Sequence, residues 1–320
     1  MSFKKVSKTD SFRRLEALVD KFEPRIRDSF INAVNTSKSS VTLKELTELL
    51  EAGRINEALQ IADSIPMSVG LSVDISFTET GQDTTRVIST VAATPVFFDQ
   101  TNTGAVNAMR INRAKLIREF TQSQREAVQE SIIDGITRGL NPIDQARNFR
   151  GAIGLTRKQV QAVNNFRNLL ETQSSDALRR QLRDRRFDPT IRSSIANKKP
   201  LTKPQIDKMV NRYRERFVKF RAETIGRTEA LRSVHEANNV AFQQAIDEGA
   251  LQADELEREW HVTNDSDLRD SHSVMANQKR GFGEPFLSGN SNLLRFPGDP
   301  TAPADDVIQC RCSVTTVFKS

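Results

Sequence analysis

The residues best suited to chemistry lie in the last part of the chain, from Trp260 to Phe318. This segment holds the only Trp, two of the three His and both Cys, which are spaced as Cys310-Arg311-Cys312. Thiolate and imidazole are ligands that zinc prefers, so His272, Cys310 and Cys312 are candidate zinc ligands. Their spacing differs from that of a zinc knuckle, which offers Cys-x-x-Cys twice. The alternative is that no metal binds and both Cys pack as small buried hydrophobic residues.

The same segment permits a nuclease interpretation. His272 would act as the base, and Asp265, Asp267 or Asp270 would hold magnesium. However, Asp residues clustered in a turn usually cap backbone groups, and neither Cys has an assigned His partner as a nucleophile. We therefore predict that the chain is not an enzyme. A metal-dependent nuclease or a zinc-containing DNA-processing factor is the alternative.

One further His, His235, lies in a long helical stretch. Its spacing is typical of a surface position on that helix. We therefore predict a structural role for it and no part in chemistry.

The positive charge is concentrated in the middle of the chain, whose net charge is +6. Residues 140–233 contain 22 Lys or Arg and 9 Asp or Glu, a balance of +13, whereas residues 254–320 contain 7 and 11, a balance of −4. We expect the most basic stretch to lie close to DNA through phosphate contacts without sequence readout, solvated helix faces being the alternative. Its candidate residues are Arg179, Arg180, Arg183, Arg185, Arg186, Arg192, Lys198 and Lys199.

Nothing in the sequence predicts a membrane segment. The N-terminus lacks the apolar core of a signal peptide, and the most apolar run, Val87–Phe98, is interrupted and too short to span a bilayer. We therefore expect folding in the cytoplasm, where thiols stay reduced, and no disulfide.

Apolar periodicity predicts a mainly α fold with a small α+β C-terminal domain, that is, long amphipathic helices plus a loop-rich unit with a few short strands. We divide the chain into an N-terminal helical region with a possible short hairpin (1–95), a helical body with a basic middle (96–253) and the small α+β domain (254–320).

Helix signals are clear at several places. Thr42 and Thr156 each open a capping box, and long apolar stripes run through residues 105–140 and 206–242. A stripe over residues 12–34 predicts another helix, with Pro24 as a kink or break. Residues 72–77 alternate in polarity, which predicts one strand of a hairpin with 86–91 as its return strand, a helix being the alternative.

A combination of motifs carries a resemblance to a known family. In order, they are Arg227-Thr228-Glu229 on a helix, Trp260, Asp265-x-x-x-Arg269-x-x-His272, Phe296-Pro297-Gly298-Asp299-Pro300 and Cys310-Arg311-Cys312. Together they closely resemble the C-terminal signature of the phage head-morphogenesis, or Mu F-like minor head protein, family. The resemblance covers roughly residues 96–318. Two loop positions depart from the family pattern, Ala276-Asn277, where a Gly is frequent, and Gln309, where an Asn is frequent.

The resemblance implies a structural component of the virion, inside the capsid near the portal vertex and synthesised in the host cytoplasm. It would assist procapsid assembly, DNA packaging or DNA ejection. The implied partners are the portal protein, with major capsid or scaffold protein and packaged double-stranded DNA as further candidates, and no membrane is needed for folding. No cofactor is implied, zinc being an option. The signature residues would hold loops together: Arg227, Glu229, Trp260, Asp265, Arg269, His272, Pro297, Gly298, Asp299, Cys310 and Cys312.

Overall fold

A computed structural model describes residues 7–92 and 94–319 of the chain. Residues 1–6 and 93 of the predicted N-terminal region lie outside the described residues, as does Ser320. The backbone packs into two compact units, each built from separate stretches of sequence. We call them the sheet unit (residues up to 29, 69–116 and 223–320) and the helical unit (30–68 and 117–222). The division of the sequence at residues 95 and 253 stays a prediction.

Four long helices contribute residues to both units. They are α1 (Lys8–Ser39), α4 (Ser64–Ser89), α5 (Thr103–Thr137) and α9 (Lys203–Asp247). Helix α1 continues through Pro24, so a break there is wrong, and the alternative of a kink stays a prediction. Leu15, Phe22 and Ile26 flank the proline and are almost fully buried. Burying each contributes about 1.5–3 kcal/mol, which together exceeds the cost of about 3 kcal/mol for an interior proline.

Helix α4 replaces the predicted hairpin, and that prediction is wrong. Val69, Val73 and Phe77 are buried, whereas Ile75 is 54% exposed, so the buried positions recur every four residues and not every two. The sequence from 72 to 77 fits both periods, and only packing decides between them. Gly81 lets the Phe98 ring lie against the helix, because a Cβ there would be 2.5 Å from ring atoms.

Shorter elements complete the helical unit. Capping boxes at Thr42 and Thr156 open α2 (Leu43–Glu51) and α7 (Arg157–Glu171), as predicted. The remaining elements are α3 (Ile55–Gln60), α6 (Pro142–Ala152), the 3-10 helices η1 (Ser175–Arg179) and η2 (Arg185–Phe187), and α8 (Asp188–Ala196).

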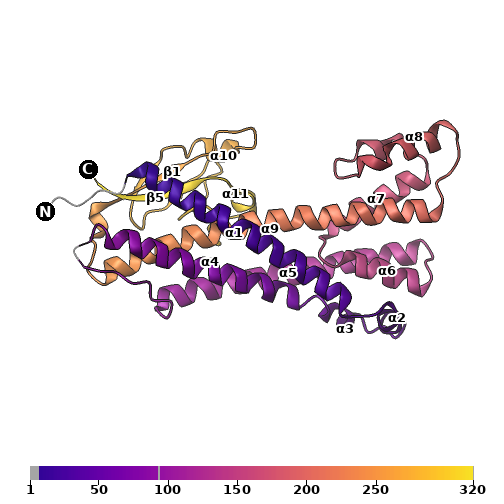
Figure 1. Ribbon diagram of the computed structural model, residues 1–320, viewed down its shortest axis with the longest axis horizontal. Helices are drawn as coiled ribbons and strands as arrows, with labels where there is room; N and C mark the ends of the chain where they lie inside the picture. The colour runs from indigo at the N-terminus through magenta and orange to yellow at the C-terminus, as the bar shows by residue number, and fades with distance from the viewer. Residues whose placement is uncertain (1–6, 93, 320) are drawn as a thin grey trace. The chain divides into compact units, whose positions relative to one another are not determined.

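The sheet unit contains the predicted small α+β part (Figure 1). Strand β1 (Leu256–His261) lies between β2 (Lys279–Gly281) and β5 (Ser313–Phe318), antiparallel to both, with Trp260 opposite Val314. A second sheet pairs β3 (Phe286–Leu287) with β4 (Leu293–Leu294). The short helices are η3 (Ala253–Glu255), α10 (Asp270–Ser273) and α11 (Ala304–Val307). The predicted fold class is confirmed.

Within the sheet unit, α9 is buried on all its faces. Every residue from 228 to 238 is buried, including His235, which is 2% exposed, so its predicted surface position is wrong. Buried polar groups on this length need partners. Arg232 pairs with Glu229 (2.9 Å to each carboxylate oxygen) and donates from Nε to the Gly298 carbonyl at 3.0 Å. The helix thereby holds the Phe296–Pro300 loop.

No helix in the described part of the chain combines the length and the apolar character that crossing a membrane requires.

The contact between Gly298 and α9 gives a prediction about stability. Gly298 has φ +83°, and a Cβ there would lie 2.9 Å from the Arg232 Cα. Gly298→Ala should lower the free energy of unfolding by roughly 2–5 kcal/mol, because left-handed strain adds to a backbone clash. Urea unfolding measures this change.

Gly249→Ala is the matched control, since Gly249 has φ +73° and no atom within 4 Å of the added Cβ. It should cost only the strain, about 1–2 kcal/mol. Equal losses in the two variants would contradict the close packing of the loop on α9.

Candidate metal centre

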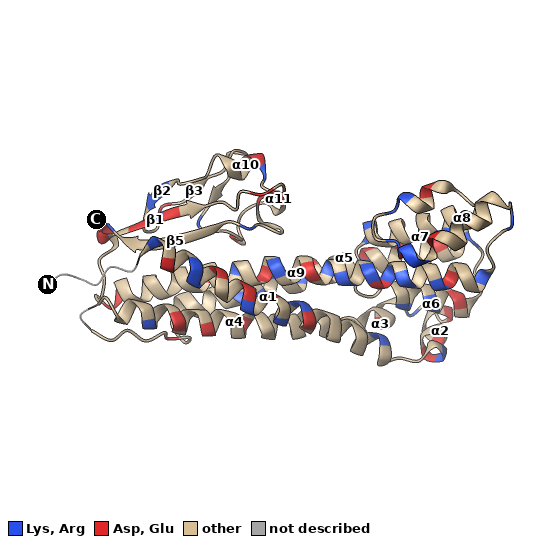
Figure 2. Ribbon diagram, turned by 45° about the horizontal axis from the view of Figure 1, so that its top comes forward, with Lys and Arg blue, Asp and Glu red and all other residues tan. Residues whose placement is uncertain are grey.

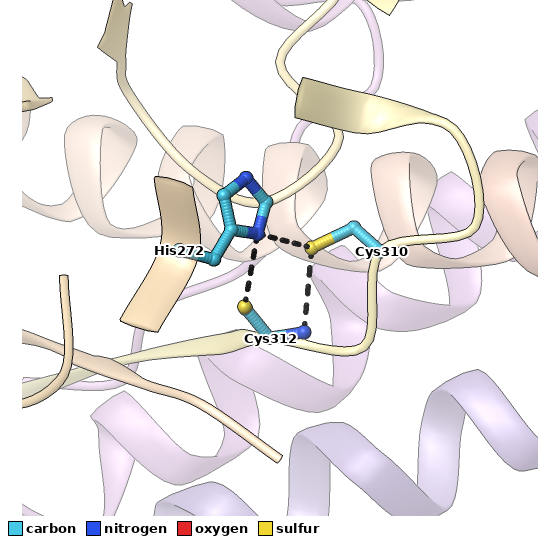
Figure 3. A group of neighbouring side chains, drawn as sticks. All are labelled: His272, Cys310 and Cys312. Carbon is cyan, nitrogen blue, oxygen red and sulfur yellow. Dashed lines mark hydrogen bonds between the residues drawn. The ribbon is translucent and has the colours of Figure 1, made fainter. Parts of the chain in front are cut away.

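Three soft ligands converge in the sheet unit (Figure 3). His272 comes from α10, and Cys310 and Cys312 come from the segment that leads into β5. The His272 Nδ1 lies 3.5 Å from Cys310 Sγ and 3.4 Å from Cys312 Sγ. All three residues are buried, at 1%, 1% and 3% exposure. The structure thus brings together the three candidates from the sequence.

Local backbone geometry puts both sulfurs on one side. Gln309 has φ +54°, and its N–H donates to Thr228 Oγ1 of α9 at 3.0 Å, which fixes the entry into the Cys pair. Beyond it the chain extends toward β5, and in extended backbone residues two apart point the same way. Arg311 therefore points away from the cluster, where it binds Asp265 (3.0 Å) and Asp267 (2.5 Å).

The two thiols differ in acidity. The Cys312 thiol donates to Cys310, which lowers the Cys310 pKa against the opposing effect of burial, and His272 and the Cys312 backbone N–H lower it further. The same contact raises the pKa of Cys312, because its proton is held toward Cys310, and burial adds to the rise. One sulfur thus favours the thiolate, the form that binds metals.

The geometry fits a zinc ion. Zn–S bonds of about 2.3 Å and Zn–N bonds of about 2.0–2.1 Å at a tetrahedral angle place sulfur and nitrogen about 3.6 Å apart. The two distances in the cluster are 3.5 and 3.4 Å. The cluster could therefore hold a metal such as zinc. In the described part of the chain, the group consists of these three residues, with no fourth His, Cys or carboxylate.

A buried carboxylate organises the loops around the cluster. It was not among the site residues predicted from the sequence. Asp306 is 0% exposed and lies 3.5 Å from the His272 Nε2, an atom without a hydrogen-bond partner. It accepts hydrogen bonds from four side chains at 2.8–3.3 Å: Ser271, Ser288, Asn290 and Asn292. Burial alone would raise the Asp306 pKa, but these donors and His272 hold it below its usual value. The only sequence signal was its position four residues before Cys310.

The other signature residues pack around this centre or brace the unit. Trp260 is fully buried, and its ring meets His272 edge-on at 6.0 Å and Phe286 at 5.2 Å. Arg269 precedes α10 and donates to the Ile308 carbonyl. Arg227 binds Glu23 of α1 at 3.2 Å.

The Phe296–Pro300 loop is held by its own ion pair. Asp299 is fully buried and accepts from the backbone N–H of Arg295 (2.8 Å), from its guanidinium (2.8 and 3.0 Å) and from Thr301. These contacts lower the Asp299 pKa although burial opposes them. Pro297 is also buried. The loop is therefore a packed structural turn.

The set required by the nuclease interpretation is not assembled. His272 faces the two Cys and Asp306, whereas Asp265 and Asp267 are exposed and bind Arg311. Asp270 is exposed at the start of α10. The predicted base and magnesium ligands therefore do not form one site.

The basic stretch lies in the helical unit, where Figure 2 shows blue segments on α7, α8 and the nearby length of α9. Part of its charge is neutralised internally: Arg179 pairs with Asp176, Arg183 with Asp188, and Arg186 with Asp184. Among the described residues no carboxylate lies within 4.0 Å of the other five, which are Arg180, Arg185, Arg192, Lys198 and Lys199.

Comparisons with protein-family models, with curated proteins and with solved structures found no match to this chain.

The role of Asp306 can be tested by removing its charge. Asp306→Asn should lower the free energy of unfolding by about 2–4 kcal/mol, because its amide N–H groups would face donors that now bind a carboxylate. Chemical denaturation measures the loss.

Asp305→Asn is the control, because Asp305 lies in the same short helix but is exposed. Its effect should stay within about 0.5 kcal/mol. If the two substitutions were equally harmless, Asp306 would not organise the loops.

Proposed function

We propose that this chain is a structural minor head protein of a tailed phage. It would act inside the capsid near the portal vertex, in procapsid assembly, DNA packaging or DNA ejection. One observation supports this most: the residues that carry the family resemblance are mainly buried packing and loop-bracing groups of a single unit. Trp260, His272, Asp299, Cys310 and Cys312 are each at most 3% exposed. Residues arranged in this way hold a fold together.

The space around the cluster favours this role over catalysis. The cavity that Cys312 lines has a volume of about 20 Å³. Such a space accommodates about one water molecule and no substrate. A catalytic zinc needs an open position where substrate can bind. The alternative of a DNA-processing enzyme therefore gains no support from this region.

We infer further that the cluster holds a structural zinc ion. Cys310 and Cys312 would bind it through sulfur and His272 through Nδ1. The other ring nitrogen faces Asp306, and a metal-binding His usually donates its second N–H to a carboxylate. The ion would connect α10 to the segment before β5, adding a link between loops that Asp306 already joins.

The helical unit offers a surface for packaged DNA. Its five unpaired cations, defined above, belong to η2, α8 and the loops around them. Phosphate contacts from such residues would position the protein on DNA without reading the sequence. Phe22, Phe77, Phe149 and Phe166 are buried, so these four side chains would not form the portal contact.

The zinc proposal predicts about one zinc per chain in protein purified without chelator, measured by inductively coupled plasma mass spectrometry. His272→Ala should lose most of the metal, because it removes one of three ligands. His261→Ala should keep it, since His261 lies on β1 and bonds Thr315 outside the cluster. Metal-free wild-type protein, or equal zinc in the two variants, would contradict the site.

The virion proposal predicts that particles of the phage encoding this chain contain a few copies of it, cross-linked to portal protein. Mass spectrometry of purified procapsids measures both. Its absence from particles would contradict the proposal. Magnesium-dependent nicking of plasmid by the wild type, lost in His272→Ala, would instead support the enzyme alternative.

A further inference from the structure

One cavity of the helical unit is strongly cationic. It has a volume of about 580 Å³ and lies among α1, α6, α7 and α9. Its lining includes seven Lys or Arg side chains and three Asp or Glu side chains. Cavities of this size typically hold ligands as large as a nucleotide.

The three carboxylates of the lining are already engaged. Asp144 binds Arg147 (2.7 Å) and Lys203 (3.0 Å). Asp207 binds Arg167 at 2.6 Å. Glu215 binds Arg212, which lies outside the lining, at 2.6 Å. The acidic groups therefore leave part of the positive charge uncompensated.

Three cations in this cavity have no carboxylate partner within 4.0 Å among the described residues: Lys38 of α1, Arg150 of α6 and Arg214 of α9. Arg214 donates only to amide oxygens, those of Asn148 (2.9 Å) and Asn211 (3.3 Å). Its guanidinium lies against α6 where Gly151 has no side chain, since a Cβ there would be 3.0 Å from the Arg214 Cζ. Arg150 and Arg214 both line this cavity.

Arg150 and Arg214 both act on Lys38. Burial, and next the charge of Arg214, lower the pKa of Lys38 to about 8, with Arg150 adding to the effect and Glu215 opposing it. Burial also lowers the pKa of Arg214 to about 10, and Arg167 contributes. Like charges held together in a partly buried space repel one another, and an anion between them would relieve that cost.

We propose that this cavity is a phosphate-binding site, in which Lys38, Arg150 and Arg214 contact the oxygens of one phosphate-bearing ligand. Guanidinium groups bind phosphate through paired N–H donors, and a lysine ammonium adds a point charge. The phosphate could come from a free polyphosphate or from a nucleic-acid backbone, which share this chemistry. The inference is independent of the virion role proposed above, because it rests only on the cavity.

Isothermal titration calorimetry with the full-length protein tests the site, using sodium pyrophosphate in one arm and a 20-base-pair DNA duplex in the other. The wild type should bind at least one of the two. Lys38→Gln and Arg150→Gln should each weaken that binding at least tenfold. Binding of pyrophosphate would assign the site to free polyphosphates, and binding of the duplex alone would assign it to a phosphate backbone.

Lys158→Gln is the matched control, because Lys158 is an exposed lysine of the same unit outside the cavity. It should bind like the wild type. Thermal unfolding checks the variants: Lys38 and Arg150 form no ion pair, so neither substitution should lower the melting temperature. Because the two residues lie on different helices, either variant alone can decide the test. No binding by the wild type, or equal binding by all four proteins, would overturn the proposal.

Discussion

The sheet unit depends on the contact between Arg232 and the Phe296–Pro300 loop. The guanidinium is buried, so it needs partners, and it has two: Glu229 on its own helix and the Gly298 carbonyl. Only glycine fits at 298, because the backbone there is left-handed and touches the helix. This contact fixes the loop on α9. A second bond from the same helix, between Thr228 and the Gln309 N–H, fixes the start of the Cys pair.

The need of buried polar groups for hydrogen-bond partners also explains the region around the cluster. Its buried polar groups are joined through Asp306, which takes one donor from α10 and three from the loop between β3 and β4. Charged acceptors of this kind are expensive to bury and hold their surroundings in one arrangement once satisfied. The cluster thus lies among segments that Asp306 holds in one arrangement. A buried, well-braced cluster is typical of a structural metal site, which supports the zinc proposal.

Sequence patterns predicted those helix starts whose signal lies within a few neighbouring residues. The capping boxes at Thr42 and Thr156 each depend on neighbours within a few residues, and the structure contains both. Helix α4 was missed because residues 72–77 fit two periods equally well.

The site was only partly predictable for the same reason. Residue type alone identified His272 and the Cys pair, since few side chains bind zinc. Asp306 has partners up to 35 residues away, and Lys38, Arg150 and Arg214 meet only through the fold. Such groups carry no spacing signal, because their proximity is created by packing.

We propose that the His272, Cys310 and Cys312 cluster of the C-terminal region is a closed, structural zinc site. X-ray absorption spectroscopy at the zinc K-edge tests it most directly on protein as purified. If His272, Cys310 and Cys312 bind the ion, the spectrum should show sulfur at about 2.3 Å from zinc together with nitrogen at about 2.0–2.1 Å. A spectrum with oxygen and nitrogen neighbours alone would contradict it, because the ion would then lie away from Cys310 and Cys312.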